Sequence, residues 1–157
     1  MSGFRRGVRI GVDVGKARVG VARSDPDGML ATPVETVTRN DDSIARVLAL
    51  AGEHEAMEIV VGLPISLSGG DTPSTADARA FAQGLAAASA LPVRLVDERL
   101  STVSAHSALR GSGRSQRNSR SIVDQVAAVV LLQQALDVEK STGRPLGTSV
   151  PPDQEPA

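Results

Sequence analysis

Three groups of acidic residues in this 157-residue chain lie where carboxylates often do chemistry. Asp13 ends an apolar, β-branched stretch, and the neighbours Asp97 and Glu98 follow another. Asp124 begins a helical stripe that is otherwise apolar and should pack against a sheet. Carboxylates that converge without His or Cys form an all-oxygen site, which suits Mg²⁺ or Mn²⁺. We therefore predict a divalent-cation site formed by Asp13, by Asp97 or Glu98, and by Asp124.

Each acid also has a purely structural interpretation. Asp13 could hydrogen-bond the turn that follows it, as Asp often does at the end of a strand. Side chains alternate along a strand, so one of Asp97 and Glu98 should face solvent. Ser121 and Asp124 have the spacing of a capping box, which stabilises the start of a helix without any chemistry. A divalent-cation site therefore requires that these acids converge in the fold.

Basic residues accompany these acids, although the whole chain has a net charge of −1. Residues 101–123 contain four arginines and no acid, and residues 1–23 hold six Lys and Arg against one acid. Carboxylates alone repel phosphate, so an enzyme that acts on phosphodiesters needs cations close by. We predict a rim that contacts phosphates, with a solvated linker as the alternative for the loop. Its members are Arg5, Arg6, Arg9, Lys16, Arg18, Arg114, Arg117 and Arg120.

The composition excludes several other chemistries. There is no cysteine, which excludes thiol nucleophiles, Cys-ligated zinc and iron–sulfur clusters. The two histidines, His54 and His106, are too few for a His-rich metal centre, and we interpret both as structural or surface residues. Two Phe, without Tyr or Trp, cannot form an aromatic platform for stacked bases. No apolar run approaches 18 residues, so we expect no membrane partner.

The elements that must position the acids follow from hydrophobic periodicity and turn residues. Strands are predicted at 8–13, 18–23, 29–37, 58–63 and 92–97, and helices at 43–56, 73–90, from 101 to the glycines at 111–113, and 121–140. This order predicts a mixed α/β sheet of five strands, three antiparallel and then two parallel, flanked by helices. We expect one domain over residues 1–141 and a disordered tail over residues 142–157.

Four motifs occur in an order that resembles a known family. They are Asp13-Val14-Gly15-Lys16-Ala17-Arg18-Val19-Gly20-Val21-Ala22, Val60-Val61-Gly62-Leu63-Pro64, Val96-Asp97-Glu98-Arg99-Leu100-Ser101-Thr102 and Val123-Asp124-Gln125-Val126-Ala127-Ala128. Together, over about residues 8–137, they resemble the YqgF/RuvX family of bacterial ribonuclease H-like nucleases. The resemblance implies a ribonuclease H-like fold and a cytoplasmic nuclease. It also implies that Asp13, Glu98 and Asp124 are the catalytic, metal-binding acids, which selects Glu98 over Asp97.

Members of this family are known as Holliday-junction resolvases or as nucleases that mature the 5′ end of precursor 16S rRNA. The expected reaction is hydrolysis of phosphodiester bonds by two Mg²⁺ or Mn²⁺ ions, leaving 5′-phosphate and 3′-hydroxyl ends. Lys16, Arg18, Arg114, Arg117 and Arg120 are the residues expected to bind nucleic acid. We favour precursor 16S rRNA as the substrate. The alternatives are branched DNA, which would require a two-fold homodimer, and a non-catalytic RNA-binding factor in ribosome assembly.

Overall fold

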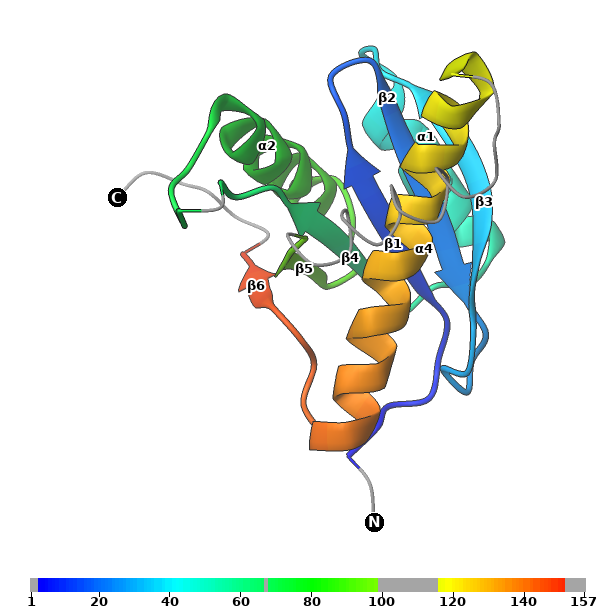
Figure 1. Ribbon diagram of the computed structural model, residues 1–157. Helices are drawn as coiled ribbons and strands as arrows, with labels where there is room; N and C mark the ends of the chain where they lie inside the picture. The colour runs from blue at the N-terminus through cyan, green and yellow to red at the C-terminus, as the bar shows by residue number, and fades with distance from the viewer. Residues whose placement is uncertain (1–2, 67, 99–115, 152–157) are drawn as a thin grey trace.

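The computed structural model describes residues 3–66, 68–98 and 116–151, with the backbone alone for residues 116–123. A mixed sheet forms the centre of the molecule, with α4 on one face and α1 and α2 on the other (Figure 1). The elements in chain order are β1 (Arg9–Val14), β2 (Arg18–Ser24), β3 (Ala31–Thr38), α1 (Ser43–Glu53), β4 (Glu58–Leu63), α2 (Pro73–Ala87), β5 (Val93–Asp97), α4 (Gln116–Thr142) and β6 (Thr148–Val150).

The strands lie in the order β3-β2-β1-β4-β5-β6. β1, β2 and β3 form an antiparallel meander, whereas β4 pairs in parallel with both β1 and β5. Every residue of β4 is buried, as expected for a central strand that is covered on both faces. The predicted fold class and the change from antiparallel to parallel pairing are therefore confirmed. The carboxyl ends of β1, β4 and β5 meet at one edge of the sheet, where the chemistry was expected.

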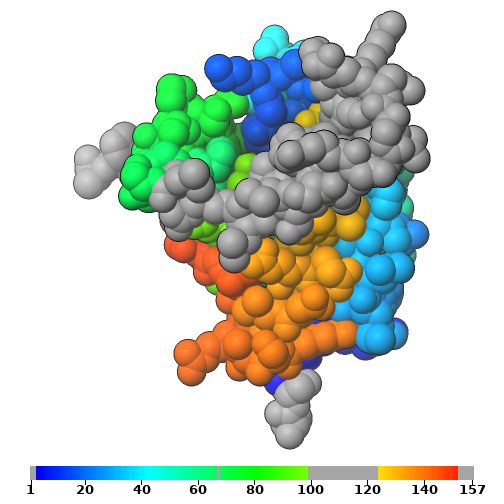
Figure 2. Space-filling model, viewed as in Figure 1, coloured from blue at the N-terminus to red at the C-terminus, as the bar shows by residue number. Residues whose placement is uncertain are grey.

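The two faces of the sheet pack differently. The face toward α1 and α2 buries large side chains such as Ile10, Val12 and Ile59. On the other face, small residues in the strands allow α4 to lie close, and Leu131 and Leu132 fill the remaining space. Figure 2 shows this side of the molecule, with the orange side chains of α4 between β3 in light blue and the red-orange segment of β6.

A sixth strand corrects the predicted strand count. β6 pairs antiparallel with β5 at the edge of the sheet, within residues that the sequence analysis assigned to a disordered tail. Arg94 on β5 explains why these residues are held, because its Nε and Nη2 donate to the carbonyls of Leu146 (3.0 Å) and Gly147 (2.6 Å). The contact joins residues more than fifty positions apart, so the local composition does not reveal it. Residues 152–157 lie outside the described residues.

The helices also differ from their predicted bounds. α4 begins at Gln116, five residues before the predicted start. Ser121 and Asp124 therefore lie inside the helix, and the capping-box interpretation of Asp124 is wrong. The helix predicted from residue 101 lies outside the described residues, as do His106 and Arg114. Across the part of the chain that the structure describes, no helix combines the length and apolar character needed to cross a bilayer.

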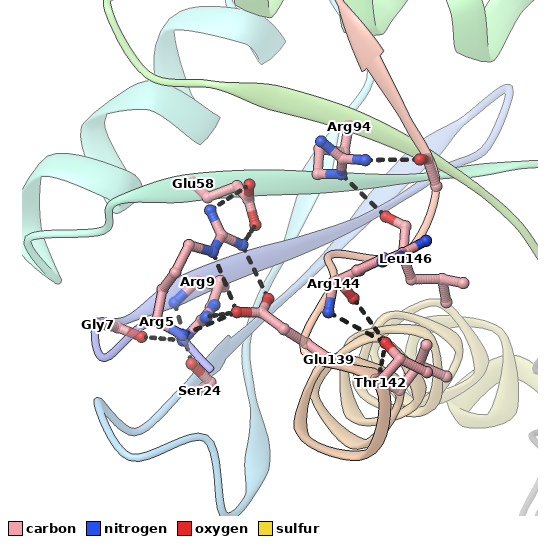
Figure 3. A network of polar contacts seen from close by, with 12 residues as sticks. Arg5, Gly7, Arg9, Ser24, Glu58, Arg94, Glu139, Thr142, Arg144 and Leu146 are labelled. Atoms are coloured by element: carbon pink, nitrogen blue, oxygen red, sulfur yellow. Dashed lines mark hydrogen bonds and ion pairs between the residues drawn. The ribbon is translucent and has the colours of Figure 1, made fainter. Parts of the chain in front are cut away.

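Arg5 and Arg9 belong to an ion network with the buried acids Glu58 and Glu139 instead of a phosphate-contacting rim (Figure 3). Arg5 bonds both Glu58 (3.0 Å) and Glu139 (2.8 Å), and buried Arg9 bonds Glu139 (3.0 Å). Arg6 pairs with Asp27 on the surface. The prediction that Arg5 and Arg9 contact phosphate is therefore corrected, because acids distant in the sequence neutralise them, whereas for the exposed Arg6 it stays a prediction. Arg9 is also the first residue of β1, at the opposite end of that strand from Asp13.

Candidate active site

Asp13 and Glu98 meet at the carboxyl edge of the sheet, where their side chains are hydrogen-bonded to each other. The backbone N–H of Glu98 donates to the carbonyl of Leu63 (3.2 Å), which ties the residue after β5 to the end of β4. Gly62 lies opposite Val96 in the sheet register. Alternation therefore directs Val96 and Glu98 to the face covered by α4, and Asp97 to the opposite face. The structure thus brings Glu98, rather than Asp97, beside Asp13.

A missing side chain at Gly62 makes room for the Glu98 carboxylate. A Cβ atom at this position would lie 2.1 Å from Oε2 of Glu98 and 3.2 Å from Cδ2 of Leu131. Glycine inside a strand often marks a place where another group approaches the backbone closely. The sequence placed Gly62 at the carboxyl end of a strand, where either a role beside the site or simple strand punctuation was open, but it did not reveal that Gly62 makes room for Glu98.

The pKa of Glu98 is raised above its ordinary value. Burial is the main cause, and the charge of Asp97 adds to it, while the hydrogen bond with Asp13 acts in the opposite direction. Burial and the charge of Asp97 therefore disfavour the ionised form of Glu98, which a cation bound beside it would favour.

Asp124 reaches the same face of the sheet because α4 lies directly on β2. A Cβ atom at Gly20 would lie 1.9 Å from the backbone oxygen of Asp124, so only glycine allows this approach. The Asp124 carboxylate accepts a 2.7 Å hydrogen bond from Nε of Arg18. Arg18 is two residues before Gly20 on β2, and alternation puts both on the face covered by α4.

The three predicted metal-binding acids thus form two separate pairings. Asp13 bonds Glu98, and Asp124 bonds Arg18. Among the described residues, no group of three His, Cys, Asp or Glu side chains is placed to hold a metal ion. The donor chemistry of Asp13 and Glu98 nevertheless fits a hard cation, because two carboxyl groups supply only oxygen ligands. Asp124 fits as a third ligand if it leaves Arg18.

Arg39, which the sequence analysis did not single out, holds the turn after Asp13. Its Nη1 donates to the carbonyl of Gly15 (2.9 Å) in this turn. The guanidinium also forms a two-bond ion pair with Asp77 on α2 (2.7 and 2.8 Å) and lies 5.1 Å from the ring centre of Phe81. These contacts fix the β1–β2 turn to α2. No local signal marks Arg39, because its partners lie elsewhere in the sequence.

Four of the five residues predicted to bind nucleic acid lie within the part of the chain that the structure describes. Lys16 is exposed in the β1–β2 turn and lines an open groove together with Arg39, Asn40, Asp41 and Asp77. Arg18 is 36% exposed despite its bond to Asp124. Arg117 and Arg120 lie in the first turns of α4, on the backbone segment that precedes Asp124. Their roles, and that of Arg114, remain predictions.

Comparison with known proteins identifies the family. A family model described as RuvX, Holliday junction resolvase, matches residues 7–138. The chain belongs to the RuvX family. This membership confirms the resemblance seen in the four motifs and the predicted enzyme class, a nuclease that hydrolyses phosphodiester bonds.

Curated relatives and solved structures agree with RuvX membership. A protein of Clavibacter michiganensis subsp. michiganensis is 57% identical over 94% of both chains and is named "Putative pre-16S rRNA nuclease". A Streptomyces coelicolor protein with the same name is 55% identical over 94% of this chain and 90% of its own. The fold is similar to T. thermophilus RuvC in complex with a Holliday junction substrate, with a TM-score of 0.55 and 18% identity over 89% of this chain and 99% of that one. This likeness confirms the ribonuclease H-like fold of the RuvX chain.

Proposed function

We propose that this RuvX protein is a divalent-cation-dependent nuclease that matures the 5′ end of precursor 16S rRNA. The observation that carries the proposal is the hydrogen-bonded pair of Asp13 and Glu98 at the carboxyl edge of the sheet. Such a pair is unfavourable in the absence of a cation, since two carboxyl groups repel each other when both are ionised. A cation there would stabilise both as carboxylates.

The residues that would hold Mg²⁺ or Mn²⁺ are Asp13 and Glu98, with Asp124 as the third ligand. When bound there, the cations would lower the pKa of the attacking water and stabilise the charge on the leaving 3′ oxygen. The chain itself positions these ligands. Gly62 leaves room for Glu98, Gly20 lets α4 bring Asp124 to the sheet, and Arg39 fixes the turn after Asp13.

The substrate would be held by cations around the acids. Lys16 is exposed beside Asp13, and Arg18 is partly exposed beside Asp124. We propose that they contact phosphates together with Arg114, Arg117 and Arg120. Such contacts give affinity that depends on salt and not on sequence.

Precursor rRNA is favoured over branched DNA because the relatives named for pre-16S rRNA are more than 50% identical over most of the chain. Branched DNA is the second candidate substrate. It is supported by the structural likeness to a RuvC complex that contains a Holliday junction substrate. A resolvase would have to act as a two-fold dimer, whereas trimming of one rRNA end has no such requirement.

The test compares wild type with Asp13→Asn on a labelled precursor 16S rRNA 5′ leader, a four-way DNA junction and duplex DNA. Asp13→Asn keeps the size of the side chain and removes its charge. We expect wild type to cut the rRNA leader only with Mg²⁺ or Mn²⁺, and the variant to cut nothing. Preferred cutting of the junction would favour the resolvase. Binding without cutting by both proteins would instead favour an assembly factor, and cutting by Asp13→Asn would refute the metal site.

A further inference from the structure

Arg18 occupies an unusual position, because it is bonded to one of the acids expected to hold a cation. Its Nε lies 2.7 Å from Oδ2 of Asp124, a short distance typical of a bond between two charged groups. The Asp124 side chain is only 15% exposed, whereas the Arg18 side chain is 36% exposed. In this pair the Asp124 carboxylate is largely buried, whereas the Arg18 guanidinium is accessible to solvent.

We propose that Arg18 alternates between two anions. It holds the Asp124 carboxylate before a cation binds, and it contacts a phosphate of the nucleic acid once Asp124 has turned to the cation. This inference rests on the cation-dependent site proposed above and adds to it a coupling between the cation and the substrate.

A cation and Arg18 would compete for Asp124. A carboxylate that accepts a charge-assisted hydrogen bond must give up part of that interaction to bind a cation. A divalent cation at Asp124 would also repel the guanidinium of Arg18 beside it. Cation binding and the Arg18–Asp124 pair therefore oppose each other, and this opposition is reciprocal by thermodynamic necessity.

Once it has left Asp124, Arg18 can bind a phosphate. A guanidinium presents five N–H donors in a fork that matches a phosphate group. Arg18 begins β2 at the same edge as Asp13, and Lys16 lies two residues earlier in the exposed turn. While Arg18 neutralises Asp124, it offers a phosphate little net charge. Once released, it adds a cation beside the acids, so nucleic acid should bind better to the loaded enzyme.

The first experiment measures Mn²⁺ binding to the metal-stripped full chain by isothermal titration calorimetry. It compares wild type with Arg18→Gln and with Arg23→Gln, a control that removes the same charge from an exposed position at the other end of β2. Arg18→Gln should bind Mn²⁺ about three- to tenfold more tightly, equivalent to about 0.7–1.4 kcal/mol. Arg23→Gln should match wild type.

Unchanged or weaker binding by Arg18→Gln would overturn the role of Arg18 while leaving the cation site in place. No Mn²⁺ binding by wild type would instead refute the cation site and this inference with it. If Arg18→Gln lowers the melting temperature, Arg18→Met provides the second variant, because methionine keeps a long apolar stem and removes both the charge and the donors. Tighter Mn²⁺ binding by that variant supports the proposal, and unchanged or weaker binding overturns it.

The second experiment measures binding of the labelled rRNA leader and the four-way junction by fluorescence anisotropy, in EDTA and in Ca²⁺, with gels to check that the probe is uncut. Arg18→Gln should lose at least about threefold more affinity in Ca²⁺ than in EDTA, where its only effect is the uncompensated charge of Asp124. An equal loss in both conditions would mean that Arg18 contacts phosphate at all times, which overturns the alternation. No loss in either condition also overturns it.

Discussion

Gly62→Ala should separate the activity of this nuclease from its stability. The added Cβ would lie 2.1 Å from Oε2 of Glu98, whereas ordinary contact begins at 3.4 Å. The carboxylate must therefore move by about 1.3 Å, because the strand backbone is held by pairing on both sides. Glu98 is flexible enough to move, so the cost to folding is small. A displacement of about 1 Å at a reacting group can nevertheless lower the rate by about 100-fold.

We expect Gly62→Ala to reduce cleavage of the rRNA leader by about 100-fold and to change the free energy of unfolding by less than about 1 kcal/mol. Cleavage is measured as a single-turnover rate at saturating Mg²⁺, and stability by urea unfolding. The matched control is Gly52→Ala on α1, where nothing lies within 4 Å of the added atom. This control should keep full activity and gain about 0.5–1 kcal/mol of stability.

Two results would refute the reasoning. If Gly62→Ala cleaves at the wild-type rate, the position of the Glu98 carboxylate does not matter for the reaction. If the free energy of unfolding of Gly62→Ala falls by several kcal/mol, the strand backbone has moved and not only the Glu98 side chain. The glycine would then be needed for folding and not for positioning Glu98.

Other substitutions test the packing and the ion network. Gly20→Ala should destabilise the protein by about 3 kcal/mol in urea unfolding, because the added atom meets the backbone oxygen of Asp124 at 1.9 Å; wild-type stability would contradict the close approach. Glu139→Gln should cost about 3–5 kcal/mol, since it leaves buried Arg9 without its counter-charge, and a loss under 1 kcal/mol would argue against the network. Burial would raise the pKa of Glu139, but its bonds with Arg5 and the charges of Arg9 and Arg5 hold that pKa below the ordinary 4.5. The stability that Glu139 contributes is therefore complete above about pH 4.5 and is lost as pH falls below it, so wild type should lose more stability than Glu139→Gln between pH 5 and pH 3 in urea unfolding.

Local patterns were sufficient to predict the central elements. β4 has the predicted bounds, because its apolar run is continuous and Pro64 follows it directly. A helix was predicted from residue 73, and α2 begins there with the Thr72 side chain as its cap. Asp13 and Glu98 were expected to meet if β1 and β5 were neighbours; β4 lies between these strands, and the two acids meet because the carboxyl ends of all three parallel strands share one edge. The bounds of β4 and the start of α2 depend on residues close together in the sequence.

Features that depend on distant partners were not predictable. Arg5 looked like part of a basic surface, but Glu58 and Glu139 neutralise it from 53 and 134 residues away. β6 is a polar segment held by the guanidinium of Arg94. The pairing of Arg18 with Asp124 spans 106 residues and joins two residues that the sequence analysis had given different roles. A charge count along the chain cannot identify such partners.

The bond between Arg9 and Glu139 has a consequence for the order in which the chain can fold during its synthesis. The two residues are 130 positions apart, and Arg9 lies in the first strand of the sheet. At about 5–20 residues per second, a ribosome needs about 7–26 s to add that length of chain. Throughout this time the Arg9 guanidinium, which is buried in the folded protein, lacks one of its acids. The nascent chain therefore reaches its final packing only when the far end of α4 has emerged, which makes completion of the domain a late step of translation.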